Sequence, residues 1–317
     1  MNRLIILSLT AALLFSCQSP KKNKLIIFHA GSLSVPLKQV CDSFQSLHPE
    51  VNIELEAAGS RTCARKITDL HKPCDIMASA DYKVIDNLLI PGHASWNLKF
   101  ASNEMTITYH EKSYRQADIN AQNWFEILLD PKVRYGRADP NSDPCGYRSV
   151  LVSRLAEAYY QRPGLADSLL AKDQHHIRPK ETDLLALLET GVIDYLFIYR
   201  SVAEQHRLKY LLLPDSINLK KPEPSEFYRQ ATVTISGKKP GETITQYGEP
   251  MIYGITQLSN APNPELAQKF LEFFFTDSAG IKIMKKNGQP SVIPASTASF
   301  EQLPAYLKPF ALMPENR

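Results

Sequence analysis

The sequence predicts an α/β protein of two lobes, each built on a sheet whose strands are separated by helices. Runs rich in β-branched residues alternate with amphipathic helical runs along most of the 317 residues. Strands that are separated by helices in this way favour sheets built from parallel units. The length favours two lobes, since one domain usually takes roughly 100–200 residues.

The first third of the chain shows the alternation clearly. The expected strands are KLIIFHA (24–30), VNIELEA (51–57) and CDIMASA (74–80). The expected helices are VPLKQVCDSFQSLHP (35–49), RTCARKITDLH (61–71) and YKVIDNLLI (82–90). In the first of these helices Leu37, Val40, Cys41 and Phe44 share one face, so that face is expected to be buried.

The rest of the chain continues the pattern. Expected strands are EMTITYH (104–110), VRYGRAD (133–139), VIDYLFIY (192–199) and EPMIYGITQ (249–257). Expected helices are NWFEILLD (123–130), GYRSVLVSRLAEAYY (146–160), TDLLALLETG (182–191), SVAEQH (201–206), NPELAQKFLEFFFT (263–276) and DSAGIKIMKKNG (277–288). The polar stretch 161–181 between two of these helices is expected to be a loop or a partial helix.

The N-terminus has the pattern of an export signal. Arg3 precedes an apolar run over residues 4–15, which is shorter than the roughly 20 residues that a membrane-spanning helix needs. The stretch LFSC (14–17) resembles a bacterial lipoprotein cleavage box. We therefore expect residues 1–16 to be a signal peptide, Cys17 to carry a lipid anchor to the membrane, and 17–23 to be a tether. A plain signal peptide with a coincidental cysteine is the alternative.

Composition excludes several classes of protein. A net charge of +3, with 22% charged and 44% hydrophobic residues, is that of an ordinary folded body, so no nucleic-acid partner is expected. No two cysteines have the CxxC spacing of a zinc or thioredoxin-like site. An exported chain can form disulfides, and Cys63 with Cys74 is one pairing to consider.

Small polar residues recur where an expected strand meets an expected helix. These corners are HAGSLS with Ser32, AAGSRT with Ser60, SDPCGY with Cys145 and YRSVAE with Ser201. The first N–H groups of a helix lack internal partners and suit anions, and in open α/β sheets ligands bind at the carboxyl ends of strands. An ordinary helix cap is the alternative at each corner. Together, the corners indicate an oxyanion cleft.

Longer motifs resemble one known family. FHAGSLSVP, EAAGSRTCARKITDL, DIMASADY, NEMTITY, NWFEILLDPKVRYGRADPNSDPCGYRS, DYLFIYRSVAEQH and PMIYGIT are similar to the tungstate/molybdate-binding proteins of ABC importers, in the branch best known from archaea. The similarity runs from about Lys24 through nearly the whole mature chain. It implies a two-lobed periplasmic-binding-protein fold of type II, with a mixed sheet flanked by helices in each lobe and a hinged cleft between the lobes.

The resemblance also implies a function and its residues. An oxyanion is held between the lobes and delivered to a membrane permease, with no cofactor, at the periplasmic or outer side of the cell envelope. The family's anion-contacting serines match Ser32 and Ser60, its backbone-donating corner matches Cys145, and its metal-approaching carboxylate matches Asp143. We expect a monomer with lobes over 24–106 plus 255–317 and over 107–254, crossing near 105–108 and 253–256.

One position departs from the family pattern. The branch carries a second metal-facing carboxylate in the strand pattern Tyr-x-Phe-Glu-Tyr, whereas this chain has YLFIY, so the matching residue is Ile198. That position then offers only a backbone contact. Glu204 or Glu249 is the alternative source of a second carboxylate.

An acid beside an anion needs a reason, because two unit charges at 4 Å repel by about 4 kcal/mol at an effective dielectric of about 20. Tungsten or molybdenum can accept an oxygen of Asp143 directly, whereas sulfur in sulfate cannot. A protonated oxyanion such as hydrogen phosphate or hydrogen arsenate would instead donate to the acid. A third interpretation is that Asp143 only caps the helix after Pro144.

Other function classes remain as alternatives. A binding protein for phosphate, sulfate or arsenate is the nearest one. An exported thiol enzyme is another, because a thiol at a helix start, as at Cys145, tends to have a lowered pKa. The chain has no G-x-S-x-G or G-x-x-x-x-G-K motif, and His175–His176 lacks metal-ligand spacing. A purely structural surface lipoprotein is the third alternative.

Overall fold

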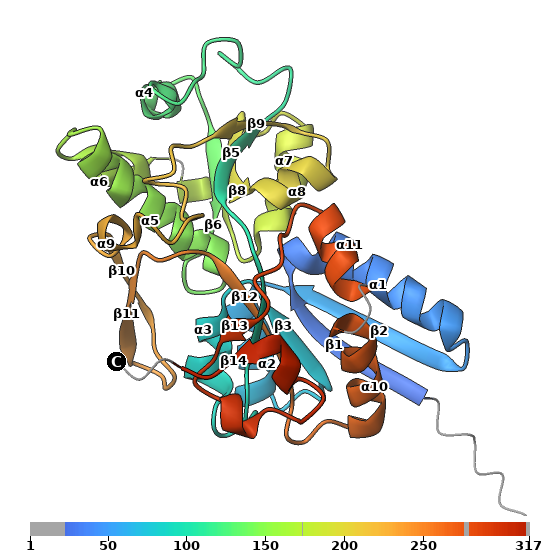
Figure 1. Ribbon diagram of the computed structural model, residues 1–317. Coiled ribbons are helices and arrows are strands. Elements are labelled where there is room, and N and C mark those ends of the chain that lie inside the picture. Colours follow the sequence, from blue (N-terminus) through green and yellow to red (C-terminus); the bar gives the residue numbers. More distant parts are fainter. Residues whose placement is uncertain (1–22, 173, 276–278, 315–317) are drawn as a thin grey trace, which may run out of the picture.

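The computed structural model describes residues 23–172, 174–275 and 279–314, which form two mixed sheets flanked by helices (Figure 1). The strand order is β2-β1-β3-β12-β4 in one sheet and β7-β6-β8-β5-β9 in the other. We call the first sheet with its helices the first lobe, and the second sheet with its helices the second lobe. The expected signal peptide, the lipidation site Cys17 and the tether up to residue 22 lie outside the described residues.

The first lobe contains the N-terminal part of the chain and one strand and two helices from its C-terminal part. In its sheet β1 pairs in parallel with β2 and β3, whereas β12 is antiparallel to β3 and β4. Its strands are β1 (Asn23–Ala30), β2 (Val51–Ala58), β3 (Ile76–Ser79), β4 (Leu98–Ser102) and β12 (Ile252–Gln257). Its helices are α1 (Ser34–Leu47), α2 (Ser60–Thr68), α3 (Tyr82–Val84), α10 (Pro264–Phe275) and α11 (Gly280–Lys286).

The second lobe contains the middle of the chain. Here β6 pairs in parallel with β7 and β8, and β5 is antiparallel to β8 and β9. Its strands are β5 (Met105–Tyr109), β6 (Tyr135–Ala138), β7 (Ile177–Arg178), β8 (Tyr195–Tyr199) and β9 (Lys209–Leu212). Its helices are α4 (Trp124–Leu129), α5 (Pro144–Tyr159), α6 (Leu165–Ala171), α7 (Leu185–Glu189) and α8 (Arg200–Gln205).

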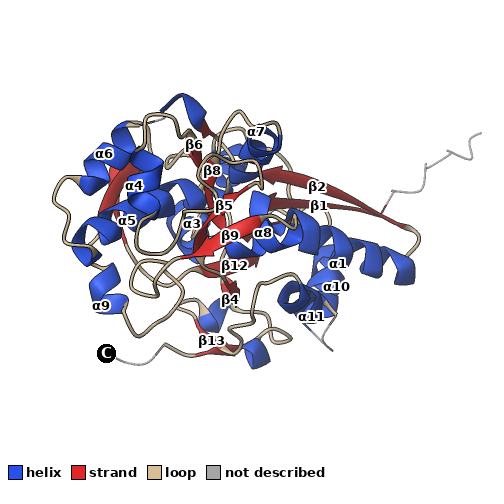
Figure 2. Ribbon diagram, turned by 90° about the horizontal axis from the view of Figure 1, so that it is seen from above, coloured by secondary structure: helices blue, strands red, loops and turns tan. Residues whose placement is uncertain are grey.

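Burial follows the hydrophobic patterns of these segments. All five residues of β8 are buried, as its continuous apolar run predicts for a central strand. The predicted inner face of α1 is confirmed, since Leu37, Val40, Cys41 and Phe44 are all buried. Viewed from above, the strands run through the middle of the molecule with helices around them (Figure 2).

Smaller elements were not expected from the sequence. A short helix, α9 (Ser225–Tyr228), precedes an antiparallel hairpin of β10 (Thr232–Ser236) and β11 (Thr243–Tyr247), and β13 (Ala295–Ser296) pairs with β14 (Ala311–Leu312). The stretch 161–181, for which a loop or a partial helix was expected, contains the helix α6 and the unexpected strand β7. The last predicted helix begins at Gly280 as α11, within the described part of the chain.

The chain crosses between the sheets through segments that lie side by side. The first sheet's β4 ends at Ser102 and the second sheet's β5 begins at Met105. The backbone N–H of Met105 donates to the carbonyl oxygen of Asn218 (2.9 Å). The backbone N–H of Met251 donates to the carbonyl oxygen of Leu219, the neighbour of Asn218 (2.9 Å). This junction is where a hinge would act. The residue limits given above for each lobe stay a prediction.

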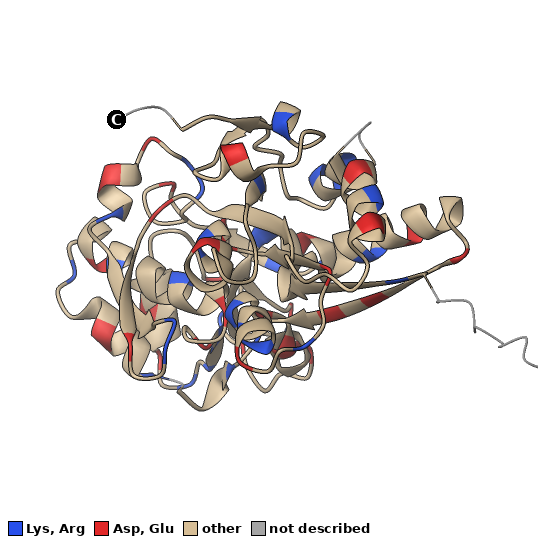
Figure 3. Cartoon of the chain, turned by 90° about the horizontal axis from the view of Figure 1, so that it is seen from below, with Lys and Arg blue, Asp and Glu red and all other residues tan. Residues whose placement is uncertain are grey.

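Along the chain, Lys and Arg are interspersed with Asp and Glu, as the colours of Figure 3 show. This distribution agrees with the small net charge of +3. No helix in the described part of the chain is long and apolar enough to cross a membrane.

Candidate functional site

Segments from both lobes meet where β1 and β2 end and α5 begins. A β-carbon built on Gly31, after β1, would lie 2.8 Å from Oε2 of Glu181, and one built on Gly59, after β2, would lie 2.3 Å from the carbonyl oxygen of Ser142. The neighbour of Gly59 is backbone, which cannot turn aside, so only glycine allows that approach. The two lobes are therefore in contact around this point, and the cleft between them is closed.

The structure brings the four predicted binding residues of this region to the closed interface. Ser32 and Ser60 follow the two glycines of the first lobe, and Asp143 and Cys145 open α5 of the second lobe. Each of the four is at most 2% exposed. A ligand held among them would be shielded from bulk water.

Both serines have a hydroxyl hydrogen left to donate. The Oγ of Ser60 accepts a hydrogen bond from the backbone N–H of Ala80 (2.9 Å), and the Oγ of Ser32 accepts one from the hydroxyl of Tyr253 (3.0 Å). Tyr253 in turn accepts from the side-chain amide of Asn103 (2.9 Å). A hydroxyl that already accepts from the protein is set to donate onward, so these serines suit a ligand with acceptor oxygens.

Asp143 caps α5, as one interpretation of the sequence expected. Its Oδ1 accepts from the backbone N–H of Cys145 (2.8 Å), and its Oδ2 accepts from the backbone N–H of Glu181 (3.1 Å). Burial nevertheless raises the pKa of this carboxyl. The cap and a ligand role are compatible, because a carboxylate oxygen has more than one lone pair.

Glu181 is a further acid at this interface, and the sequence did not single it out. Its side chain is 1% exposed, and neither carboxylate oxygen accepts a hydrogen bond from an N–H or O–H donor of the described residues, so its one polar neighbour is the Asp143 carboxyl, with which it can share a proton. Burial, and next the neighbouring Asp143 carboxyl, raise the pKa of Glu181 well above its usual range. A buried acceptor without such a donor is destabilising, so this carboxyl indicates a ligand that supplies a partner.

The sequence does show that Glu181 stands at the start of a helix. It stands at the start of a helical run, ETDLLALLE, so it could be taken for a simple first-turn acid. The structure begins a 3-10 segment, Glu181–Leu184, at this residue and runs it into α7. Glu181 therefore stands at the same kind of corner as Ser32 and Ser60.

One buried cation lies behind the site. Arg148 of α5 pairs with Asp81 of the first lobe (Nη2 to Oδ2, 3.2 Å) and donates to the carbonyl of Ala80 (2.8 Å) and the hydroxyl of Tyr199 (3.0 Å). Both partners of this ion pair are at most 3% exposed. Removing either partner would leave a buried charge uncompensated, so the pair fixes how α5 meets the first lobe.

The thiol of Cys145 is not a nucleophile in this setting. It is fully buried, and burial, with a further contribution from Asp143, raises the pKa of the Cys145 thiol well above its usual range. The expectation of a lowered pKa at the helix start is therefore wrong, because loss of hydration outweighs the helix terminus here. All four cysteines in the described residues are free and buried: Cys41, Cys63, Cys74 and Cys145.

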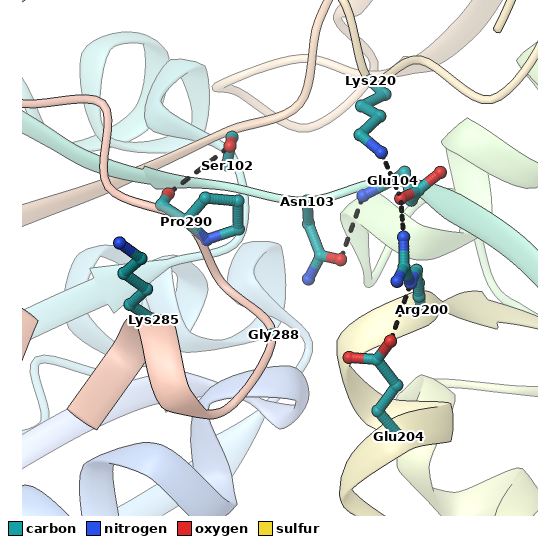
Figure 4. A pocket seen from close by; sticks show the side chains of 9 residues that line it. All are labelled: Ser102, Asn103, Glu104, Arg200, Glu204, Lys220, Lys285, Gly288 and Pro290. Carbon is teal, nitrogen blue, oxygen red and sulfur yellow. Dashed lines mark hydrogen bonds and ion pairs between the residues drawn. The ribbon is translucent and has the colours of Figure 1, made fainter. Parts of the chain in front are cut away.

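The other three predicted residues occupy different surroundings. Ile198 lies in β8, where its backbone pairs with Thr106 and its side chain belongs to the hydrophobic core. Glu204 bonds to Arg200 (2.7 Å) and lines a pocket of about 190 Å³ near the crossing segments (Figure 4). Glu249 pairs with Lys83 (2.6 Å). The backbone contact at Ile198 stays a prediction, and it is Glu181 that lies beside Asp143.

The described residues contain no group of three or more His, Cys, Asp or Glu side chains that could hold a resident metal ion. The pair of Asp143 and Glu181 alone is a small ligand set for a structural metal. The serine hydroxyls and the two carboxyls together are instead suited to a solute that binds and leaves.

Comparison with known proteins agrees with this architecture. Residues 25–289 match the family described as bacterial extracellular solute-binding protein. The chain belongs to this family. It is therefore a binding protein and not an enzyme, its solute is cargo, and no cofactor is involved.

Individual relatives span nearly the same length as this chain. An uncharacterized solute-binding protein of Petrotoga mobilis is 49% identical, covering 90% of this chain and 89% of the relative. The molybdate/tungstate-binding protein WtpA of Pyrococcus abyssi is 42% identical, with 91% of this chain and 90% of the relative covered. Such a family of extracellular proteins implies a periplasmic location.

A solved structure confirms the predicted fold. The periplasmic molybdate-binding protein of Azotobacter vinelandii superposes with a TM-score of 0.60 at 16% identity, covering 85% of this chain and 99% of that one. At this identity the likeness speaks for the fold alone. The fold class expected from the sequence, two mixed sheets flanked by helices as in periplasmic binding proteins, is confirmed.

Proposed function

We propose that this solute-binding protein captures tungstate or molybdate between its lobes. The observation that carries the proposal is the pair of buried Glu181 oxygens that accept no hydrogen bond from an N–H or O–H donor of the described residues, beside Asp143 and against Gly31, the residue before Ser32. The named relative from Pyrococcus abyssi, 42% identical over 91% of this chain, supports the choice of ligand.

The mixture of donors and acids narrows the ligand by its chemistry. Ser32 and Ser60 offer O–H donors, which suit the outer oxygens of an oxyanion. Glu181 offers only acceptor atoms when ionised, which would repel an ordinary dianion. An oxoanion of a heavy metal satisfies both sides, because its oxygens accept hydrogen bonds while its central atom accepts carboxylate oxygens.

The same proposal covers delivery and location. We infer that the loaded protein is a monomer that passes its cargo to the permease of an ABC importer. We further infer that a lipid on Cys17 anchors it at the periplasmic or outer face of the cell envelope. The LFSC stretch and the apolar run before it support the anchor. A lipid at the N-terminus would keep the two-lobed body near the membrane, where it can pass its cargo to the permease.

A second candidate is a protonated oxyanion such as hydrogen phosphate or hydrogen arsenate. Its O–H would donate to Glu181, so this carboxyl favours it over sulfate, which carries no proton at neutral pH. Competition separates the two candidates. A tungstate binder keeps its tungstate in excess phosphate, whereas a phosphate binder does not.

Titration calorimetry of tungstate against carboxyl variants tests the proposal. Glu181→Gln and Asp143→Asn should each weaken tungstate binding by about tenfold or more, because each replaces a carboxyl that can give an oxygen to the metal with an amide that is a poorer ligand. Both substitutions keep the size of the side chain, so the fold should persist. Glu204→Gln is the matched control and should bind as the parent does, since Glu204 bonds to Arg200 and Tyr210 instead.

Two results would count against the assignment. Affinities of Glu181→Gln and Asp143→Asn within about twofold of the parent would remove both acids from the ligand site. Binding of phosphate, with no heat from tungstate, would favour the second candidate.

A further inference from the structure

The hairpin of β10 and β11 reaches from one lobe to the other. Its strand β10 packs against α5 of the second lobe. Its two strands stay paired to the base, where the N–H of Gly248 donates to the carbonyl of Ala231 (3.0 Å). The other end of the hairpin lies against α2 of the first lobe, where two arginines donate to it. The hairpin thus bridges the cleft on a route separate from the crossing segments.

Arg61 is the buried part of this bridge. Its Nε donates to the carbonyl oxygen of Asn141 (3.0 Å), and its Nη2 donates to the Oγ (3.0 Å) and the carbonyl oxygen of Ser236. The residue is 2% exposed. All three acceptors are neutral oxygens from the second lobe or the hairpin, so the guanidinium keeps its hydrogen bonds only while the lobes stay together.

Arg65 extends the contact along the same helix. Its Nη1 donates to the carbonyl of Lys238 (2.9 Å), and its Nη2 donates to the carbonyl of Gly237. The hairpin is in turn joined to the second lobe where the N–H of Ser236 donates to Oδ1 of Asn141 (2.8 Å). We call Arg61, Arg65, Asn141 and Ser236 the interlobe clasp.

The clasp lies immediately behind the proposed ligand site. Arg61 follows Ser60 in the chain, and Asn141 stands two residues before Asp143. The guanidinium of Arg61 nevertheless bonds to the hairpin and to the Asn141 carbonyl. Opening the cleft would move Ser60 away from Asp143, and this same motion would break the bonds that both arginines make to the hairpin and to Asn141. The pairing of Arg65 with Asp69 would remain.

We propose that Arg61 and Arg65 are positioning residues that hold the cleft shut and set the rate at which the bound oxyanion leaves. The inference rests on the proposed function. The apparent affinity of a ligand falls with the fraction of protein in the binding-competent state, so bonds made only in the closed state strengthen binding without touching the ligand. Bonds from a charged donor are the stronger kind.

The dissociation rate of tungstate, chased with excess molybdate, tests the clasp. The double variant Arg65→Ala, Asn141→Ala removes partly exposed side chains, so it should fold normally. Arg61→Met removes the buried guanidinium. Both should speed dissociation by about tenfold or more, while the association rate stays within about threefold of the parent.

Lys66→Met is the matched control on the same helix. Lys66 bonds to Glu56 of β2 (2.5 Å), a contact that stays within the first lobe. This variant also loses a basic side chain and an ion pair from α2, yet its tungstate should leave at the parental rate. A general effect of charge on α2 would instead speed dissociation in the control as well.

The outcomes separate this inference from the function on which it rests. Tungstate binding by the parent, with unchanged dissociation from both clasp variants, overturns the clasp and leaves the proposed function standing. An equal acceleration in Lys66→Met overturns it too. A parent that binds phosphate and not tungstate contradicts the proposed function alone, and the clasp is then judged from phosphate dissociation in the same variants.

Discussion

Ser32 and Ser60 differ from ordinary helix-capping serines in what their hydroxyls do. The cap position of α2 is Gly59, and Ser60 is the first residue inside the helix. Ser32 likewise lies inside the 3-10 turn Gly31–Leu33 and accepts from Tyr253. Of the predicted site residues at helix starts, only Asp143 makes a side-chain cap bond. The serines are therefore available to a ligand in a way that a capping serine is not.

His29, in β1 near the site, gives a prediction about stability and pH. Burial lowers the pKa of His29 from 6.5 to about 4, so the folded protein keeps this ring neutral while the unfolded chain takes up a proton below about pH 6.5. Stability from this group is present above pH 6.5 and is lost as the pH falls toward 4. Between pH 7 and pH 5 the loss should be about 2 kcal/mol.

Urea unfolding of the parent and of His29→Gln at the two pH values measures this loss. The variant should lose about 2 kcal/mol less than the parent between pH 7 and pH 5, because it has no ring to protonate. The acids of the site are present in both proteins, so their own pH dependence cancels in the comparison. Equal losses in parent and variant would show that His29 is not buried neutral.

At the level of elements, the position of Asp143 depends on how closely α5 follows β6. A β-carbon built on Gly146, in the first turn of α5, would lie 2.4 Å from the carbonyl carbon of Asp139 and 2.6 Å from the carbonyl oxygen of Ala138. These are backbone atoms, which cannot turn aside as a side chain does. The helix start reaches the cleft only because this position has no side chain.

Gly146→Ala should therefore push the start of α5 away from the end of β6. We expect it to destabilise the protein by about 1–3 kcal/mol and to weaken tungstate binding, since Asp143 moves with the helix. Gly92→Ala is the control, because nothing lies within 4 Å of its built β-carbon. Chemical denaturation measures the loss of stability, and calorimetry measures the loss of tungstate affinity. A Gly146→Ala variant with the stability and affinity of the parent would contradict the close approach.

Some of the elements could be predicted from the sequence and others could not. The inner face of α1 and the buried strand β8 could be predicted, because hydrophobic periodicity is a local property. The β10–β11 hairpin could not. Its strands are short, only Ile235 and Gln246 in them are buried, and its contacts are with residues far away in the chain, such as Arg61 and Asn141.

At the level of the whole molecule, the closed cleft joins residues that no local pattern connects. Asp81 meets Arg148, Gly31 meets Glu181, and Arg61 meets Ser236 across the two lobes. The sequence placed Ser32, Ser60 and Asp143 in one site through family resemblance, whereas the lack of a donor to Glu181 among the described residues appears only when the lobes are brought together. The sequence offered Glu204 and Glu249 as a second acid, and Glu181 is a candidate that only the closed interface brings forward.

The central claim is that carboxylate oxygens of Asp143 and Glu181 join the oxygens of the anion around the bound metal. X-ray absorption at the tungsten edge of the tungstate complex tests it most directly, because it gives the number of oxygens around the metal and their distances from it. We expect additional oxygens at a longer distance than the four of free tungstate, and fewer of these additional oxygens in Glu181→Gln. A spectrum identical to that of free, four-coordinate tungstate would contradict it.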